Sequence, residues 1–415
     1  MRWRTMLALL CVSLMFGQSC LAFSDTADAL DAAEGLTMTL SGLTLRQLTG
    51  TEHGRETLNA FLAPLSAQAA LKKDVARLAF LSGDAEIAAL RMGAGEEKAT
   101  RELPHITLAR IFDETLPALF SAGIPEEGLP EPEQRTVNIR NLGKSTQRTT
   151  LTLSPAQAET ALAAVQDAAA RLSGHLPHTA EIAAWVQDMG AVSDLTLKRL
   201  ENAEGRAVAW SMTGRIASAG KDVRNLNLYG GISGNNVYVS LKLPARSGKN
   251  RLELVIDLKD KAGKKENAWS GTVSYKRVRD GESFTIKDTL DLENDHTSGE
   301  RITGSVKREL TADGIKTVWT LKPELTGDGH SLQGTLSATK KHAQTQVWQM
   351  TMSVSLQEGA SVDGSAAETP EQFAGLLLGY LTDQRASLSE EDQRQLDHML
   401  RTDEWMNGTS AAVPQ

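Results

Sequence analysis

The feature that most constrains this chain is an alternation of apolar and polar residues from about residue 195 to residue 356. Segments 237–243 and 252–258, for example, place Val, Leu or Ile at every second position. Such alternation is typical of antiparallel strands with one buried face and one solvated face. Joints such as Asp280-Gly281 and Asp313-Gly314 fall between the runs and indicate hairpin turns. The sequence therefore predicts a long antiparallel meander.

A glycine recurs inside this meander, each time with apolar residues two positions before and after it. The glycines are Gly271, Gly304 and Gly334, and successive copies lie roughly thirty residues apart, the length of one long hairpin. Alternation places each glycine on the apolar face, where glycine usually marks a bend or a close approach of another element. A series of such positions lets a sheet curl.

The same inner face gathers large, adaptable apolar side chains. The candidate ligand-cavity residues are Trp210, Trp269, Trp319, Trp348, Met350 and Met352. One interpretation is that they form a filled core beneath helices. The other is that they line a cavity for a hydrophobic ligand, since such cavities are largely apolar and Met adapts to irregular shapes.

Helical periodicity replaces the alternation before the meander. A capping box at residues 154–157 predicts a helix that ends near Gly174. A second helix is predicted from Thr179, its N-cap, with Gly190 just past its end. Both are amphipathic and need a surface to lie on. The predicted fold class is α+β: a large curved antiparallel β-meander, half-barrel like, packed on amphipathic helices, with a helical C-terminal tail.

Residues 36–102 carry mixed signals. Alternation from Leu36 indicates strands, a stripe from Leu58 to Leu65 fits a helix despite Pro64, and Ala-rich hairpins are predicted across 75–92. Further on, four prolines with interspersed Glu residues predict an exposed loop. These prolines are Pro117, Pro125, Pro130 and Pro132. We expect residues 23–357 to form a single large domain.

The C-terminal region begins with a small, polar segment, 358–368, that predicts a linker. Residues 369–415 are predicted to be a helical tail. Its capping box at 369–372 opens a helix, and a second cap at Ser387 with Glu390 opens a polar helix. The first helix carries an apolar stripe of Phe373, Leu376, Leu377, Tyr380 and Leu381. This stripe either docks on the sheet as a lid or binds a protein partner.

The N-terminus has the three parts of a secretory signal. Arg2 and Arg4 precede an apolar run at 5–16, which is too short to span a bilayer, and the small residues Cys20 and Ala22 suit a cleavage site. We predict a signal peptide, 1–22, cleaved after Ala22. Acylation of Cys20 as the first residue of a lipoprotein is the alternative. Either way the protein is expected to be exported, to the periplasm, the cell surface or the extracellular space.

Composition excludes several classes of function. The only two cysteines lie in the first twenty residues, so zinc fingers, iron–sulfur clusters, thiol nucleophiles and disulfide scaffolds are not expected. A formal net charge of −8 gives no electrostatic drive toward nucleic acid. The eight His are scattered, and only His175 and His178 are close, in a loop. Ser337 and Lys340 match Ser-x-x-Lys but fall in a hairpin rather than at a helix start. We expect no enzyme, no metal and no cofactor.

The order of these elements across roughly residues 36–356 resembles the lipoprotein-carrier half-barrel proteins of the LolA and LppX type. The hairpins from Trp210 to Leu356 are also similar to uncharacterised exported bacterial β-sheet proteins. In half-barrel families, a curved sheet wraps around helices and an apolar cavity takes up lipid chains. No residue motif is shared, so the resemblance implies no particular binding residue. The long helical tail departs from the usual carrier.

Two non-catalytic functions follow as hypotheses, and a hydrolase whose site is invisible in sequence order stays open as a third. The first is an exported, non-catalytic binding or carrier protein of the cell envelope whose apolar sheet face takes a lipid or similar hydrophobic ligand. The second is a cell-envelope scaffold or protein-interaction module that binds an envelope protein through Phe373, Leu376, Leu377 and Tyr380 of the C-terminal amphipathic helix.

Overall fold

The structure is a computed structural model. It describes residues 36–48, 55–72, 75–93, 110–172, 189–218, 223–233, 236–244, 251–262, 266–279, 281–295, 300–312, 314–327, 331–359 and 370–394. The predicted signal peptide, most of the predicted linker and most of the helix predicted from Thr179 lie outside these residues.

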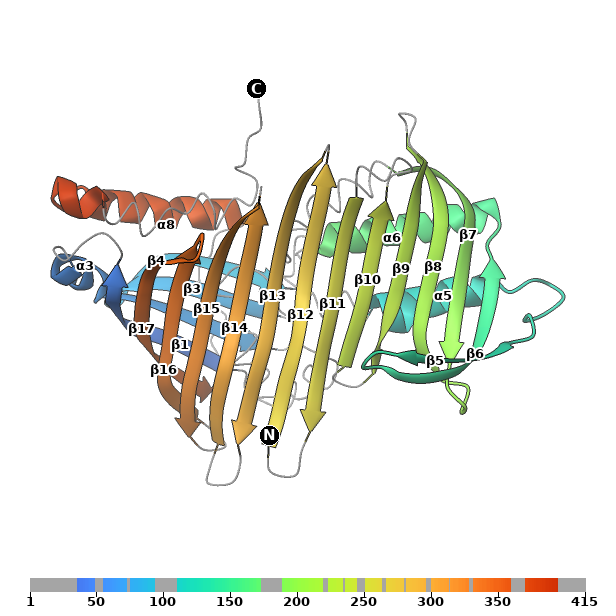
Figure 1. Cartoon of the computed structure of the whole chain (residues 1–415), viewed down its shortest axis with the longest axis horizontal. Helices are drawn as coiled ribbons and strands as arrows, with labels where there is room; N and C mark the ends of the chain where they lie inside the picture. The colour runs from blue at the N-terminus through green and yellow to red at the C-terminus, as the bar shows by residue number, and fades with distance from the viewer. Residues whose placement is uncertain are drawn as a thin grey trace.

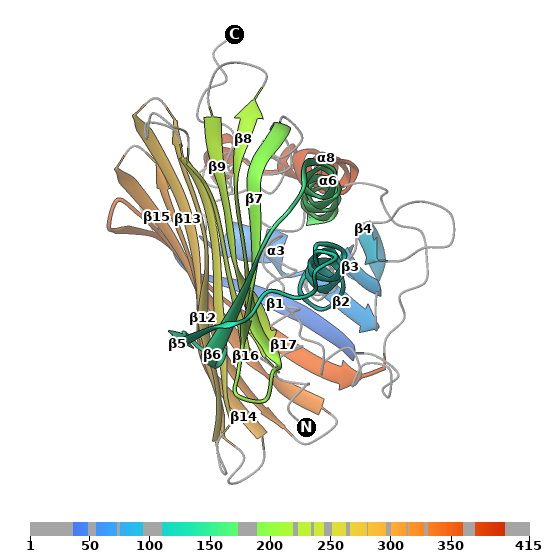
Figure 2. The same ribbon diagram turned by 90° about the vertical axis from the view of Figure 1, so that its right-hand side faces the viewer.

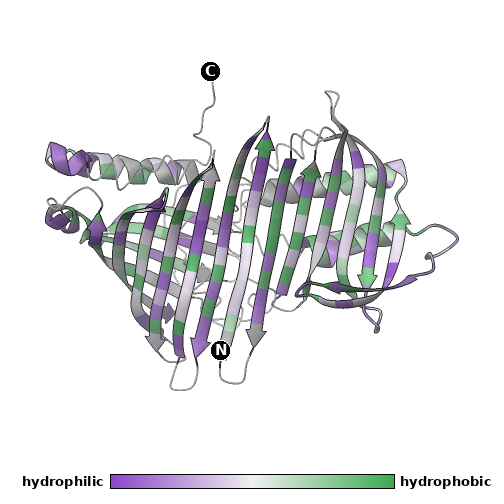
Figure 3. Cartoon of the chain, viewed as in Figure 1, coloured by the Kyte–Doolittle hydropathy of each residue, from purple (hydrophilic) through white to green (hydrophobic). Residues whose placement is uncertain are grey.

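The described strands form one antiparallel sheet of seventeen strands (Figure 1), as the alternation predicts. In the order in which they pair, the strands are β5 (Glu133–Ile139), β6 (Gly143–Thr152), β7 (Met189–Glu201), β8 (Ala207–Ser218), β9 (Val223–Ser233), β10 (Asn236–Pro244), β11 (Arg251–Ala262), β12 (Glu266–Arg279), β13 (Glu282–Asp295), β14 (Glu300–Ala312), β15 (Ile315–Gly327), β16 (Ser331–His342), β17 (Thr345–Glu358), β1 (Leu36–Leu48), β2 (Leu65–Lys72), β3 (Val75–Ser82) and β4 (Ala85–Gly93). Figure 3 shows hydrophobic and hydrophilic residues alternating along the central strands.

The first strand of the described chain pairs with the last one inside this series. β1 pairs with β17 on one side and with β2 on the other. The N-terminal strands β1–β4 therefore extend the meander beyond its last strand. In Figure 1 they turn back behind β13–β17, and Figure 2 shows them on the side of the sheet that also carries the helices.

Few helices accompany the sheet. Within the described residues they are α3 (Arg55–Leu62), the π-helix η1 (Arg110–Thr115), α5 (Leu116–Ala122), α6 (Pro155–Leu172) and α8 (Pro370–Arg385), and residues 390–394 are helical as well. The side chain of Asn59 on α3 accepts from the backbone N–H of Leu45 at 2.6 Å and donates to its carbonyl, which fixes α3 to β1. None of the described helices is long and apolar enough to cross a membrane.

We call the face of the sheet that carries Trp210, Ile256 and Trp348 the inner face. Its apolar side chains form the main buried cluster together with residues of α3, α5, α6, β2 and β3. The part of this cluster on β2 and β3 includes the small residues Ala67 and Ala69. Burial on one face of each strand explains why the alternation predicts the meander so well.

The three recurring glycines lie on the inner face, as predicted, and form a diagonal across it. Gly271 pairs with Leu290, two residues before the Leu292 that pairs with Gly304. Ile302, two residues before Gly304, pairs with Leu325, which in turn pairs with Gly334. Each glycine thus lies two strands further across the sheet and two residues further along.

A side chain does not fit at any of the three positions. A Cβ on Gly271, Gly304 or Gly334 would lie 2.3, 2.2 or 2.0 Å from a backbone oxygen of the preceding strand. Gly304 also has φ +128°, which residues with a side chain rarely adopt. The glycines therefore allow neighbouring backbones to approach closely along one line of the sheet.

On the outer face, the turn between β5 and β6 is fixed to the middle of the sheet. The Arg140 guanidinium pairs with Asp257 at 2.6 Å and lies 4.8 Å from the centre of the Tyr238 ring. Asn141 Nδ2 donates to the carbonyls of Val237 and Leu258, which are partners in the β10–β11 ladder. This turn covers a small second apolar cluster that includes Leu142.

The structure confirms one local prediction and contradicts two others. The capping box is present: Ser154 N–H donates to Gln157 Oε1 at 2.8 Å, and Gln157 N–H donates to Ser154 Oγ at 3.4 Å. The predicted cap at Ser387 is wrong, because Ser389 Oγ accepts from the backbone N–H of Asp392. Pro117 is also not in a loop, since it lies in the first turn of α5, where the missing N–H costs nothing.

Gly190 does not follow a helix. It lies in β7, which begins at Met189, and Met189 pairs with Ser218 of β8.

Candidate functional site

A row of paired residues crosses the inner face from β13 to β17 and brings polar groups into the apolar surface. Asp288, Arg308, Trp319, Lys340 and Trp348 are successive partners across the five strands. Because directly paired residues project from the same face of a sheet, the five side chains share the inner face.

Two of the predicted tryptophans flank a buried lysine within this row. Trp319, Lys340 and Trp348 are 7%, 4% and 9% exposed. The Lys340 ammonium lies 5.7 Å from the centre of the Trp319 ring, a cation–π distance. Trp348 is opposite Lys340 on the next strand, which puts the two Cβ atoms about 4.5–5.5 Å apart.

Trp348 lies at a point where β17 pairs irregularly with both of its neighbouring strands. The pairing of β16 with β17 shifts after Lys340, and the pairing of β1 with β17 shifts between Leu45 and Gln47. Bulges of this kind redirect side chains and are frequent next to functional sites. Here they put both Leu45 and Leu48 in the main buried cluster beside Trp348.

Within the part of the chain that the structure describes, the indole N–H groups of Trp269 and Trp348 on the inner face are buried and have no hydrogen-bond partner. Most buried donors in folded proteins are paired, and leaving one unpaired costs roughly 1–3 kcal/mol. An unpaired donor on an apolar surface is therefore a position where an acceptor atom of a ligand would be stabilised.

The structure groups only some of the six predicted cavity residues. Met350 and Met352 follow Trp348 on β17 and share its face, so these three and Trp319 lie together on β15–β17. Trp269 lies on β12 and is buried there. Trp210, on β8, packs against Phe120 of α5 with ring centres 5.5 Å apart.

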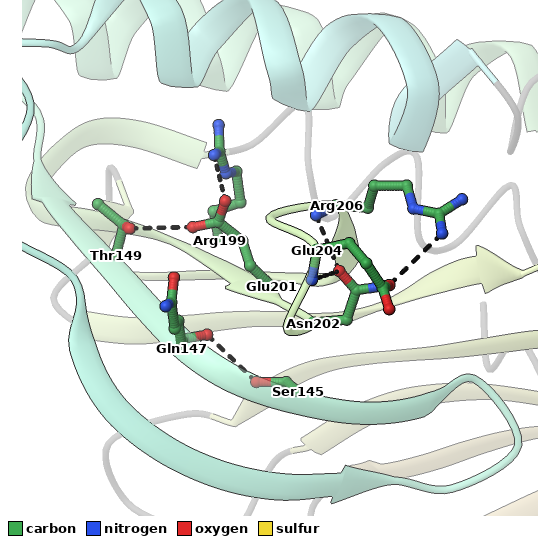
Figure 4. Close-up of polar contacts among 8 residues, drawn as sticks. All are labelled: Ser145, Gln147, Thr149, Arg199, Glu201, Asn202, Glu204 and Arg206. Atoms are coloured by element: carbon green, nitrogen blue, oxygen red, sulfur yellow. Dashed lines mark hydrogen bonds and ion pairs between the residues drawn. The ribbon is translucent and has the colours of Figure 1, made fainter.

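A second polar cluster lies on the inner face near α5, and its carboxylate is bonded within the cluster (Figure 4). Glu201 accepts from Arg199 through one carboxylate oxygen and from Thr149 Oγ1 at 3.2 Å through the other. The Arg199 guanidinium lies 5.1 Å from the centre of the Phe120 ring. The charges of Arg199 and Glu201 are matched, although the buried Nε of Arg199 makes no hydrogen bond within the described residues, and the cluster anchors α5.

Figure 4 also draws contacts of Ser145 and Asn202. Ser145 Oγ donates to the carbonyl of Gln147 at 3.2 Å, while Asn202 Oδ1 accepts from the backbone N–H groups of Glu204 and Arg206. The asparagine thus closes the turn between β7 and β8.

Arg308 is matched in the same way. Its Nε and Nη2 atoms each donate to one oxygen of Asp288 at 2.7 Å, a bidentate pair.

Lys340 and the Asp288–Arg308 pair were not among the predicted site residues. A signal was present, because Lys340 occupies an apolar-face position in the alternation of 332–340. The Ser-x-x-Lys match is not a catalytic pair, since Ser337 and Lys340 are three residues apart on one regular strand and project from opposite faces. Within the described residues, no three His, Cys, Asp or Glu side chains gather as a metal site would require. His175 and His178 lie outside those residues.

The apolar stripe of α8 is partly engaged within the chain. Phe373 packs against Phe80 of β3, with ring centres 5.8 Å apart, and Tyr380 donates to Ser82 Oγ at 2.8 Å. Leu376 projects outward and is 48% exposed. A protein partner for this helix stays a prediction.

Comparison of the whole chain with models of known protein families, with curated proteins and with solved structures finds no match.

Proposed function

We propose that the protein is an exported, non-catalytic binding or carrier protein of the cell envelope, and that it holds a lipid or similar apolar ligand against the inner face of its sheet. The observation that carries the proposal is the pair of buried, unpartnered indole N–H groups on a face rich in Trp and Met. Ligand sites for apolar molecules combine such a lining with a few polar groups that fix orientation.

The shape of the sheet supports the proposal. The glycine diagonal permits close strand contacts, and β1–β4 turn back on the side of the helices (Figure 2). We propose that this curvature makes a half-barrel packed on amphipathic helices, as in the LolA and LppX type. The segment 1–22 supports export, with cleavage after Ala22 or acylation of Cys20.

The space for the ligand is proposed to lie between β15–β17 and the Ala-containing strand β2. Ala67 and Ala69 of β2 belong to the same buried cluster as Trp319, Trp348 and Met352. Small side chains on one wall and flexible thioethers on the other suit an acyl chain, because Met adapts to its shape.

Native mass spectrometry of the purified protein, with lipid extraction, tests this function. We expect a co-purifying lipid, and we expect Met350→Trp to reduce its occupancy by filling inner-face volume. Ser353→Trp is the matched control, since Ser353 lies on the same strand but is exposed on the other face. A protein that carries no lipid and takes up none from vesicles would contradict the proposal.

A further inference from the structure

The outer face of the sheet changes in character between its middle and the strands β16, β17 and β1, which lie side by side (Figure 1). On β12, β13 and β14 this face carries many charged side chains: Lys276, Lys287, Asp291, Glu293, Lys307 and Glu309. Two paired rows across β16, β17 and β1 carry no charge at all. These rows, which we call the neutral patch, are Gln333–Ser355–Thr39 and Thr335–Ser353–Ser41.

The side chains of the neutral patch are open to solvent. Gln333, Thr335 and Ser353 are exposed, and the other three are half-buried. Within the described residues, none of the six makes a side-chain hydrogen bond or an ion pair. Five of them carry a hydroxyl group and the sixth an amide, and both kinds of group can donate and accept. The patch therefore offers donors and acceptors that the described chain does not use.

Strand pairing arranges these groups as a regular grid. Neighbouring strands lie about 4.7–4.9 Å apart, and residues two positions apart on one strand are separated by roughly 6.6 Å. A chain laid between the two rows meets polar groups at a constant spacing along both of its edges. Each hydrogen bond alone is weak, so the grid favours an extended, repetitive ligand over a small molecule.

From the grid and its lack of charge we infer that the neutral patch binds an uncharged polysaccharide chain laid across β16, β17 and β1. Sugar hydroxyls match its donors and acceptors without the burial of a charge. The patch ends at β15, where Glu324 pairs with Thr335. It lies on the face opposite to the proposed lipid ligand, so the inference goes beyond the carrier function.

Other ligand classes fit the neutral patch less well. An anionic ligand requires cations, and the six residues include none. An acyl chain requires apolar area, which the patch lacks. Protein interfaces draw most of their affinity from aromatic and Arg side chains and are poor in Ser.

Affinity electrophoresis of the full-length protein in native gels tests the inference. The gels contain dextran, amylose, hydroxyethylcellulose or glycol chitin, all of which are uncharged polysaccharides. We expect at least one of the four to retard the wild type relative to a gel without polymer. Dextran sulfate, which adds negative charges to the dextran chain, should not retard it.

Substitutions assign the retardation to the patch. Thr39→Val, Thr335→Val and Ser353→Ala together remove three hydroxyl groups and keep the shape of the strands. This triple variant should bind the retarding polymer about ten-fold or more weakly. The matched control is Thr272→Val with Thr289→Val, two half-buried hydroxyls on the charged part of the same face, and it should bind as the wild type does.

Thr335→Lys gives a readout that does not depend on a loss alone. The new cation should weaken binding of the uncharged polymer and introduce retardation by dextran sulfate. A variant that had failed to fold would not exchange one preference for the other.

The outcomes are decisive for the patch and leave the carrier function to its own test. Retardation that the triple variant loses and the control keeps supports the inference. Retardation by none of the four uncharged polymers overturns it, as does binding that the triple variant retains or that the control loses equally. Stronger retardation of the wild type by dextran sulfate than by dextran also overturns it. None of these results bears on lipid occupancy of the inner face.

Discussion

Single residues determine whether neighbouring strands can approach as closely as they do, and Gly304 is one of the most constrained. Its φ is +128°, and a Cβ would lie 2.2 Å from the backbone oxygen of Asp291. We predict that Gly304→Ala destabilises the protein by about 2 kcal/mol or more, because the contact is with backbone and cannot be relieved by a rotamer change. Urea unfolding followed by tryptophan fluorescence measures the effect.

The control for this substitution is Gly375→Ala in α8. Apart from its chain neighbours and the backbone of its own helix, no described atom lies within 4 Å of the position where its Cβ would be. Alanine in a helix is favoured over glycine, so the variant should be more stable by roughly 0.5–1 kcal/mol. Equal effects of the two substitutions would show that close strand contact is not what requires glycine at Gly304.

A carboxylate on the outer face gives a pH dependence with a defined sign. Burial raises the pKa of Glu309, hydrogen bonds from Lys307 and Lys316 lower it, and the net pKa lies below its usual value of 4.5. A lowered folded-state pKa adds stability above pH 4.5, and this stability is lost as the pH falls through the folded-state value. Glu309→Gln should therefore lower stability at neutral pH and flatten its decline in acid. Thermal melts across this range test the prediction, and an unchanged slope would contradict it.

At the scale of elements, α8 offers a direct comparison between an engaged and an exposed side chain. Phe373 contacts Phe80, whereas Leu376 is largely exposed. We predict that Phe373→Ala destabilises the protein by about 2 kcal/mol, less than the loss for a fully buried Phe, and that Leu376→Ala changes stability by less than about 0.5 kcal/mol. Denaturant midpoints measure both. Similar small effects would favour a helix that is free to bind a partner.

The elements that the sequence predicts best are those with a local signal. The meander, the α6 capping box and the hairpin of β3 and β4 all follow from spacing within a few residues. The β5–β6 hairpin, by contrast, was not predicted, because it has weak alternation and follows a proline-rich segment. Its position depends on Arg140 and Asn141, whose partners lie about a hundred residues away.

The candidate site was likewise predictable only in the part that depends on local spacing. Alternation alone places Trp319, Trp348, Met350 and Met352 on one face. Their convergence with Lys340 depends on the registers of β15, β16 and β17 and on a bulge beside Trp348. Register and bulges are set by tertiary pairing, which no short segment encodes.

For the whole molecule, the most consequential contact is the pairing of β1 with β17. Leu36 lies opposite Glu358, and the ladder continues to Leu48 opposite Trp348. Strands so distant in sequence pair only after a long loop has closed, which slows folding. β17 therefore connects the N-terminal strands to the rest of the sheet. It also supplies Trp348, which pairs with Lys340 in the inner-face row.

Two truncations separate this role from that of the C-terminal helix. A chain that ends at Gly359 lacks α8 and should still unfold in one cooperative transition, with a lower midpoint, because every strand pairing is retained. A chain that ends at Gln344 also lacks β17, so β1 keeps only β2 as a partner and β1–β4 lose the strand that joins them to β16. We expect rapid proteolysis of residues 36–93 in the shorter chain and protection in the longer one, measured by limited digestion and mass spectrometry. Equal protection in both would mean that β1–β4 are held by the helices and not by β17.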